Sequence, residues 1–475
     1  MSNYRRISDI QADIRSGKTN CVQLVKSYIA RIEENKHLNA FLEVWAEEAL
    51  EKAAVIDQKF KSGTPGHLAG AVIALKDNLA YKGHKVSAAS NILQGFESVF
   101  TATAVQRLLD EDAIILGRTN CDEFAMGASN ENSAFGPVRN AIDPERVPGG
   151  SSGGSAVAVQ AHLVHASLGS DTGGSIRQPA AFCGLFGLKP TYGLISRWGL
   201  LAYASSFDQI GPLTHSLEDN ILLTEIMAGP DEQDATVSDR PAPQYHAYQS
   251  AGKYTFAVMR QAIEHPGLDA NVKSETESLI KSLIDQGHTV TYFDFEYLDY
   301  LVPTYYVLTT AEASSNLSRY SGLLYGHRSQ RAKDLESTFT LSRSEGFGEE
   351  VKRRIMLGTF VLSSDYYDAY YSKAQKVRRI IQNKTREVLS GADAILIPTT
   401  STPAFKLGEK SKDPIAMYLA DLFTVQANIA GNCAISIPVA KTATGLPLGM
   451  QLMCGDFEEQ KLFDVSSEIL RICNS

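Results

Sequence analysis

The sequence predicts an α/β fold, with one large domain in which a mixed, mostly buried β-sheet is sandwiched by helices. Two observations lead to this prediction. The chain has 475 residues, of which 44% are hydrophobic and 21% charged, enough to bury a large core without disulfide staples. Along it, short apolar runs typical of buried strands alternate with segments of helical periodicity.

The elements follow one another in a regular order. The first 60 or so residues are expected to be helical, because apolar residues recur at helical spacing after a cap at Thr19 or Asn20. A buried strand at 70–75 ends at Lys76, and a helix near 102–110 leads to a strand at 113–117. Further strand-like runs lie near 166–169, 254–259, 288–294, 393–398, 433–439 and 447–453. Further helices are expected at 156–169, 216–228, 269–286, 349–386 and 457–472.

The stretch from Ala228 to Lys253 is poor in large apolar residues and contains three prolines. It fits either a domain linker or a long surface loop, and we favour the loop because strand-like runs on both sides could join one sheet. We therefore treat 1–475 as one domain. Its parts are a helical segment at 1–66, a core at 67–210 and the remainder at 211–475.

Charge and cysteine content exclude several classes of protein. The net charge is −9, so the chain has no global field that would attract nucleic acid or an anionic membrane. Its six cysteines form no C-x-x-C pair and are expected to be reduced, mostly buried thiols, which favours a reducing compartment. No run reaches the roughly 18 apolar residues of a membrane span, and no signal peptide is recognisable. We expect a cytoplasmic protein with no membrane partner.

Two runs rich in glycine and serine, at 149–155 and 169–175, abut apolar segments instead of linkers. A phosphate cradle is weakly supported, because neither run matches a phosphate-binding motif. Gly149 to Gly153 satisfies G-x-S-x-G, but that elbow must follow a strand, and Pro144 and Pro148 argue against one. A third interpretation adds Lys76, since a lysine that burial keeps neutral can activate a serine nucleophile.

Three segments together, Lys76-Asp77-Asn78, 149–155 and 169–180, resemble the amidase signature family. Lys76 precedes Ser151 by 75 residues, and Ser151 precedes Ser175 by 24. The similarity extends through 122–127, 131–137 and 187–191, and it covers the chain from about residue 8 to 470. It implies the amidase signature fold.

The resemblance implies a Ser-cisSer-Lys triad. Ser175 would be the acyl-ester nucleophile, Ser151 the bridging serine on a cis peptide bond, and Lys76 the base. The expected oxyanion hole consists of backbone N–H groups of Thr172, Gly173 and Gly174. Residue types alone do not separate Ser151 from Ser152. The motif alignment assigns the bridge to Ser151 and leaves Ser152 as a capping or packing hydroxyl.

Segments 349–355 and 366–371 resemble more specifically the glutamine-hydrolysing subunits of tRNA-dependent amidotransferases. For free glutamine the resemblance implies that Arg354 clamps the α-carboxylate, Asp421 pairs with the α-ammonium and Tyr305 adds a hydrogen bond. Arg353 is the competitor of Arg354. Arg177 is expected to hold the nucleophile loop.

The implied function is the release of ammonia that converts mischarged Glu-tRNA(Gln) or Asp-tRNA(Asn) into the amidated form. The resemblance assigns ATP, Mg²⁺ and tRNA to a partner B subunit, adds a small C subunit, and gives this chain no cofactor. The basic region 319–386 also holds acidic residues, so we favour a mixed solvated face there over a tRNA surface. The alternative function is a stand-alone amidase for small aliphatic, aryl or peptide amides, which would need the triad but no Arg354/Asp421 pair.

Overall fold

The computed structural model describes residues 3–246, 252–410, 417 and 420–473. Its centre is one mixed sheet of eleven strands, as the sequence predicts. In spatial order these are β1 (Phe41–Val44), β3 (Ile114–Thr119), β2 (Val72–Lys76), β4 (Ala166–Asp171), β6 (Gln209–Thr214), β5 (Phe186–Lys189), β10 (Ala434–Lys441), β11 (Pro447–Met453), β9 (Ala394–Pro398), β7 (Thr255–Met259) and β8 (Thr289–Phe293). β2 is parallel to both β3 and β4, and β7 is parallel to both β8 and β9, whereas the other pairings are antiparallel.

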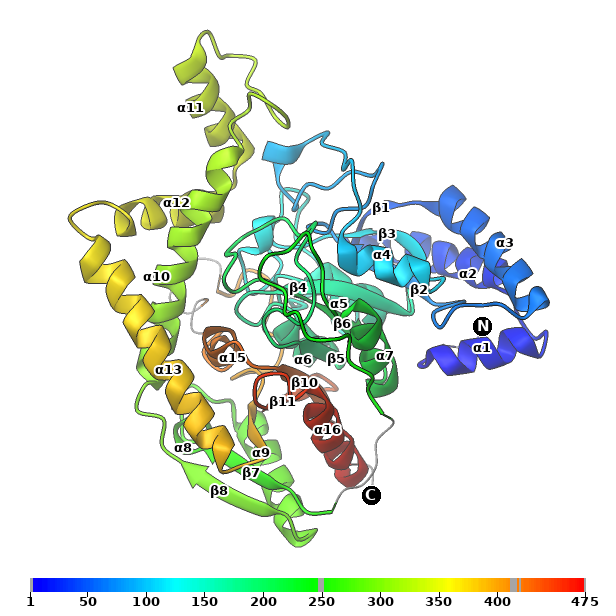
Figure 1. Cartoon of the computed structure of the whole chain (residues 1–475), viewed down its shortest axis with the longest axis vertical. Coiled ribbons are helices and arrows are strands. Elements are labelled where there is room, and N and C mark those ends of the chain that lie inside the picture. The colour runs from blue at the N-terminus through cyan, green and yellow to red at the C-terminus, as the bar shows by residue number, and fades with distance from the viewer. Residues whose placement is uncertain (1–2, 247–251, 411–416, 418–419, 474–475) are drawn as a thin grey trace.

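Helices cover both faces of this sheet (Figure 1). The helices of the first half are α1 (Ile7–Arg15), α2 (Cys21–Glu34), α3 (Ala46–Ser62), α4 (Thr103–Asp110), α5 (Gly153–Gln160), α6 (Arg177–Cys183) and α7 (Leu217–Met227). Those of the second half are α8 (Arg260–Ile263), α9 (Ala270–Asp285), α10 (Leu298–Asn316), α11 (Leu335–Gly346), α12 (Glu349–Val361), α13 (Lys373–Ser390), α15 (Val425–Ala430) and α16 (Glu459–Cys473). Short turns of 3-10 helix lie at Lys36–Leu38, Asn91–Leu93, Glu123–Ala125 and Leu317–Arg319, and a π-helix, η5, at Asp368–Ser372.

Alternate residues of the central strands enter different parts of the core. In β2, Val72 and Ala74 pack with α2, α3 and α5, whereas Ile73 and Leu75 pack with α4 and α7. In β9, alternate residues likewise divide between a cluster under α10, α13 and α15 and another under α9 and α16. Because side chains alternate across a strand, both faces of the sheet are buried.

Several predicted boundaries were wrong. The helix expected at 156–169 ends at Gln160, because the chain takes a left-handed turn at His162 (φ 53°) and continues into β4. The helix expected at 349–386 breaks after Val361, where the Ser363 hydroxyl donates to the Phe360 carbonyl and competes with the helix backbone. Strands β5 and β6 escaped prediction, since each is short and contains glycine, and β6 also contains Pro212. The expectation of a helical segment at 1–66 was wrong at 41–44, where the chain, after a left-handed turn at Asn39 (φ 54°), forms β1 and pairs with β3.

Three further observations concern the proline-containing stretch, the cysteines and the helices. β6 and β7 flank the proline-containing stretch and belong to one sheet, as the loop hypothesis requires; residues 247–251 of that stretch lie outside the described part. The six cysteines are free thiols, and Cys473 alone among them is exposed. None of the described helices has the length and apolar character that crossing a membrane requires.

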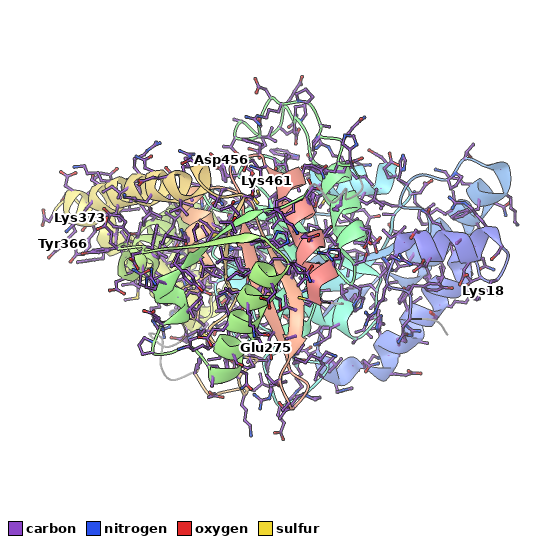
Figure 2. The ribbon with its side chains drawn as sticks, turned by 90° about the horizontal axis from the view of Figure 1, so that it is seen from below. Lys18, Glu275, Tyr366, Lys373, Asp456 and Lys461 are labelled. Atoms are coloured by element: carbon purple, nitrogen blue, oxygen red, sulfur yellow. The ribbon has the colours of Figure 1, made fainter. Side chains whose placement is uncertain are left out.

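The parallel pairing of β2 with β4 brings two motif segments together. Leu75 pairs with Leu168, so both strands end at the same edge of the sheet, one at Lys76 and the other at Asp171. This edge lies near the middle of the molecule (Figure 1). Seen along the longest axis of the molecule, Lys18 lies at one side, beside the N-terminal helices (Figure 2). Tyr366, which follows α12, and Lys373, the first residue of α13, lie at the opposite side.

Candidate active site

Lys76 is the last residue of β2 and is completely buried. Its Nζ donates hydrogen bonds to the hydroxyls of Ser151 (2.7 Å), Ser152 (2.9 Å) and Ser170 (2.9 Å). Burial lowers the pKa of Lys76 to about 8, against the opposing effect of acidic groups that include Asp122. The lysine is therefore a cation surrounded by neutral hydroxyls, and it can lose its proton at a moderate pH.

The two neighbouring serines differ in how their hydroxyls are used. Ser152 Oγ donates to the Ser170 carbonyl (3.1 Å) and accepts from the Ser170 N–H (3.3 Å), so its own proton is already engaged. The Ser152 side chain makes no capping hydrogen bond to α5. Of the two roles expected for Ser152, capping and packing, the structure therefore fits packing. Ser151 follows a cis peptide bond from Gly150, and among the described residues Lys76 is the partner assigned to its hydroxyl. Ser151 therefore retains a proton that it can donate onward.

The Gly150–Ser151 bond sits over a buried carboxylate. Asp122 accepts hydrogen bonds from the backbone N–H groups of Asn130 (2.9 Å) and Asn132 (3.0 Å). A Cβ at position 150 would lie 2.2 Å from Asp122 Oδ2, so this position requires glycine. The Asp122 carboxylate thus holds the 130–132 segment, and the Asp122 backbone N–H donates to the Ser151 carbonyl (3.2 Å).

Ser175 lies in the turn between β4 and α6, next to the Ser151 loop. Its carbonyl accepts the N–H of Ser152 (3.1 Å), and its side chain is nearly buried. Within the described residues no hydrogen bond is assigned to its hydroxyl. The structure therefore shows the Lys76–Ser151 contact and brings Ser175 beside it without the last hydrogen bond of the triad. Such bonds commonly tighten in the substrate complex.

The turn before Ser175 provides backbone donors for an oxyanion. The Gly174 N–H donates to Asp171 Oδ1 (2.9 Å), so it is already engaged. The N–H groups of Thr172 and Gly173 have no partner assigned in the described part of the chain. Of the three N–H groups predicted for the oxyanion hole, those of Thr172 and Gly173 are therefore the better candidates, and the hole itself stays a prediction.

Asp171 and Arg177 hold this turn from inside, and both are completely buried. Arg177 forms an ion pair with Asp171 (3.0 Å) and donates to the Thr424 carbonyl (2.8 Å). Burial would raise the pKa of Asp171, but Arg177 and the hydrogen bonds hold it far below its usual range. Arg177 therefore connects the turn to the segment at Thr424, which agrees with the expectation that it holds the nucleophile loop.

Arg354 and Arg353, adjacent on α12, lie in different environments. The Arg354 side chain is 4% exposed, whereas that of Arg353 is 46% exposed. Arg354 donates to Glu350 Oε1 (2.8 Å) and to the Tyr203 hydroxyl (2.8 Å). Buried positions Val351, Arg354, Gly358 and Val361 share one helix face, a spacing that already distinguishes the two arginines in the sequence.

Asp421 and Tyr305 lie near Arg354, which is the arrangement that a shared substrate site would require. The Tyr306 hydroxyl donates to Asp421 Oδ2 (3.2 Å), while the Tyr306 ring lies 5.0 Å from the Arg354 guanidinium. Burial raises the pKa of Asp421 to about 7, although Arg354 and Tyr306 oppose this. Tyr305 packs against the oxyanion turn, since a Cβ at Gly173 would lie 2.5 Å from its hydroxyl.

Sequence reasoning missed several contributors to this site: Ser170, Asp208, Tyr203, Tyr306 and Glu350. Asp208 accepts the Thr172 hydroxyl (2.6 Å) and the N–H of Tyr203 (2.9 Å), which ties the oxyanion turn to the segment behind Arg354. Ser170 could have been noticed, because it lies in a motif segment one residue before Asp171. Tyr203 and Asp208 belong to a stretch without any recognisable motif.

Known proteins resemble this chain in sequence and in fold. The family model described as Amidase matches residues 23–463. The A subunit of glutamyl-tRNA(Gln) amidotransferase from Chlorobium limicola is 50% identical over 474 residues, which cover 99% of both chains.

Two solved structures resemble this chain over most of its length. The chain resembles the A subunit of glutamyl-tRNA(Gln) amidotransferase from Thermotoga maritima with a TM-score of 0.78 and 42% identity, over 94% of this chain and 90% of that one. It also resembles a peptide amidase from Stenotrophomonas maltophilia with a TM-score of 0.82 and 27% identity, over 99% of this chain and 97% of that one. The family model spans most of the chain and includes each predicted triad position, so this chain belongs to the amidase family.

Proposed function

We propose that this chain is the glutamine-hydrolysing subunit of a tRNA-dependent amidotransferase. The observation that carries the proposal is the buried pair of opposite charges, Arg354 and Asp421, joined by Tyr306 beside the oxyanion turn. A free amino acid brings one carboxylate and one ammonium, and burying both requires one cation and one anion in the protein. The relatives named as A subunits of glutamyl-tRNA(Gln) amidotransferase, at about half identity, support the same function.

In the proposed reaction, neutral Lys76 takes the proton of Ser151, and Ser151 takes that of Ser175. The Ser175 oxygen then attacks the side-chain carboxamide carbon of glutamine. The N–H groups of Thr172 and Gly173 receive the oxyanion, a contribution of about 3–4 kcal/mol for each donor. The proton returns through Ser151 to the leaving nitrogen, the C–N bond breaks and ammonia departs. Water then hydrolyses the acyl-enzyme to glutamate and frees Ser175.

We further propose that the ammonia serves a partner subunit that amidates Glu-tRNA(Gln) or Asp-tRNA(Asn), in the cytoplasm. ATP, Mg²⁺ and tRNA would bind that B subunit, and a small C subunit would complete the assembly. The charge of the 319–386 region supports this division of work. Some of its cations pair with neighbouring acids, for example Lys352 with Glu349 and Arg331 with Glu345 (2.6 Å), which favours a mixed face over a phosphate-binding surface.

The test is ammonia release from glutamine by the purified chain, alone and co-expressed with B and C subunits. Ser175→Ala serves as the blank. Arg354→Met should abolish glutamine turnover while a simple amide such as propionamide is still hydrolysed. Arg353→Met is the matched control, because it removes the same charge one residue away on the exposed face. Efficient propionamide hydrolysis by the lone chain, with glutamine ignored in every assembly, would overturn the proposal and indicate a stand-alone amidase.

A further inference from the structure

Tyr306 on α10 touches both charged residues of the proposed substrate site. The face of its ring lies 5.0 Å from the Arg354 guanidinium carbon, a cation–π distance. Its hydroxyl donates to Asp421 Oδ2 at 3.2 Å. One side chain therefore spans the cation and the anion that the proposed function assigns to the two ends of glutamine.

We propose that Tyr306 is the specificity-determining residue that makes this site require an α-amino group, by holding the Asp421 carboxylate ionised and oriented toward the substrate ammonium. The proposal rests on the proposed function and goes beyond it, because it assigns the discrimination between amino acid amides and other carboxylate-bearing amides to one hydroxyl group. Tyr306 acts through Asp421 and is a positioning residue.

The surroundings of Asp421 explain why this hydrogen bond matters. Burial and, to a smaller extent, the nearby carboxylates of Asp171 and Asp122 raise the pKa of Asp421, which is about 7 with all of its neighbours in place. Arg354 and the Tyr306 hydroxyl lower it, and Lys410 also interacts with this carboxylate. Without the hydroxyl the balance moves toward the protonated acid, which cannot form an ion pair with an ammonium group.

The carboxylate half of the site is held independently. Arg354 donates to Glu350 and to the Tyr203 hydroxyl, and its guanidinium also lies 5.5 Å from the Tyr203 ring. Tyr306→Phe keeps the ring against Arg354 and removes the donor to Asp421. The substitution should therefore weaken recognition of the ammonium and leave recognition of the carboxylate in place.

The experiment compares two substrates that differ by one group: glutamine, and glutaramate, which is glutamine without its α-amino group. Steady-state kinetics are measured on the assembly that releases ammonia from glutamine. For Tyr306→Phe we expect the KM for glutamine to rise about tenfold, the loss typical of a hydrogen bond to a charged group, with kcat within about threefold. The KM for glutaramate should stay within about twofold. Tyr203→Phe is the matched control and should weaken both substrates, because both carry the carboxylate that Arg354 binds.

A second measurement separates positioning from simple damage to the fold. The pH at which the KM for glutamine reaches its low plateau should move upward in Tyr306→Phe, whereas the pH profile for glutaramate should not move. An unchanged preference for glutamine in the variant would overturn this inference and leave the proposed function standing. Equal losses on both substrates would also overturn it, since they would indicate a structural role. A wild-type enzyme that ignores glutamine would instead overturn the proposed function itself.

Discussion

Asp171 and Asp421 are both buried near an arginine, yet the pKa values of their carboxyl groups are shifted in opposite directions. Asp171 accepts the N–H groups of Gly174 (2.9 Å) and Ile176 (3.1 Å) and forms an ion pair with Arg177, and its pKa is far below its usual range. The side-chain hydrogen bond assigned to Asp421 in the described chain comes from Tyr306, and burial raises its pKa to about 7. A buried carboxylate whose oxygens accept several hydrogen bonds from the protein stabilises the fold. A buried carboxylate with fewer such bonds can accept more from a ligand.

A comparison of two buried lysines, Lys76 and Lys189, shows in the same way that hydrogen-bond partners distinguish buried charged groups. Burial lowers the pKa of Lys189 to about 7 and that of Lys76 to about 8, so the shift alone does not separate them. Lys189 donates to the Pro190 carbonyl (2.8 Å), which cannot pass a proton on. Lys76 donates to hydroxyls, and one of them, on Ser151, retains a proton to relay. The partners of a buried charge, and not its pKa, identify the base.

The largest change in stability should come from removing Arg177, the ion-pair partner of Asp171. Arg177→Met leaves Asp171 buried and uncompensated, which should lower the free energy of unfolding by about 3–5 kcal/mol. Arg354→Met should cost about 1–2 kcal/mol, because Asp421 can take up a proton and Glu350 keeps Arg353 as a partner. Urea denaturation of both variants at pH 7 measures the difference. Equal losses of stability in the two variants would mean that Asp171 and Asp421 depend on their neighbouring arginines to the same extent.

The second largest effect concerns the pH dependence of kcat. The proposed base is the neutral amine of Lys76, which forms above its pKa, so kcat should rise with pH and level off above about 8. Between pH 6 and pH 8 the neutral fraction, and with it kcat, should increase about fifty-fold. Initial rates at saturating glutamine from pH 6 to 9.5 measure this. A kcat that is flat or falls over this range would contradict the assignment of Lys76 as the base.

Motif residues were predictable from the sequence, and most of their partners were not. Lys76, Ser151 and Ser175 stand in recognisable segments, and the resemblance of those segments to the amidase signature family implied that the three residues act together. Ser170, a hydrogen-bond partner of Lys76, lies 94 residues from it in the sequence. The register of β2 against β4 brings the two together, and the sequence of either strand alone does not predict that register. Tyr203 reaches Arg354 across 151 residues from a stretch without periodicity. Local sequence patterns predict the helices, the strands and their buried faces. They do not predict which side chains contact one another, because those contacts depend on packing between distant segments.

A smaller effect should appear in the affinity for glutamine. Asp421 binds the substrate ammonium in its ionised form, which predominates above about pH 7, so the KM for glutamine should fall about tenfold from pH 6 to pH 8. Asp421→Asn should raise the KM and remove this pH dependence, because the amide does not titrate. Asp171 stays ionised throughout the range and contributes nothing to the profile. A KM that keeps its pH dependence in Asp421→Asn would assign the titration to another group.

The smallest effect should come from Arg353, which differs from Arg354 in exposure and not in charge. Its guanidinium forms an exposed ion pair with Glu350, and solvent screens such pairs, so Arg353→Met should change stability by less than about 1 kcal/mol. The KM for glutamine should stay within about twofold, since Glu350 still holds Arg354 at 2.8 Å. Urea denaturation and steady-state kinetics on the same preparation measure both quantities. A large rise in KM would show that Glu350 needs both arginines to orient Arg354, and that burial alone does not separate the two neighbours.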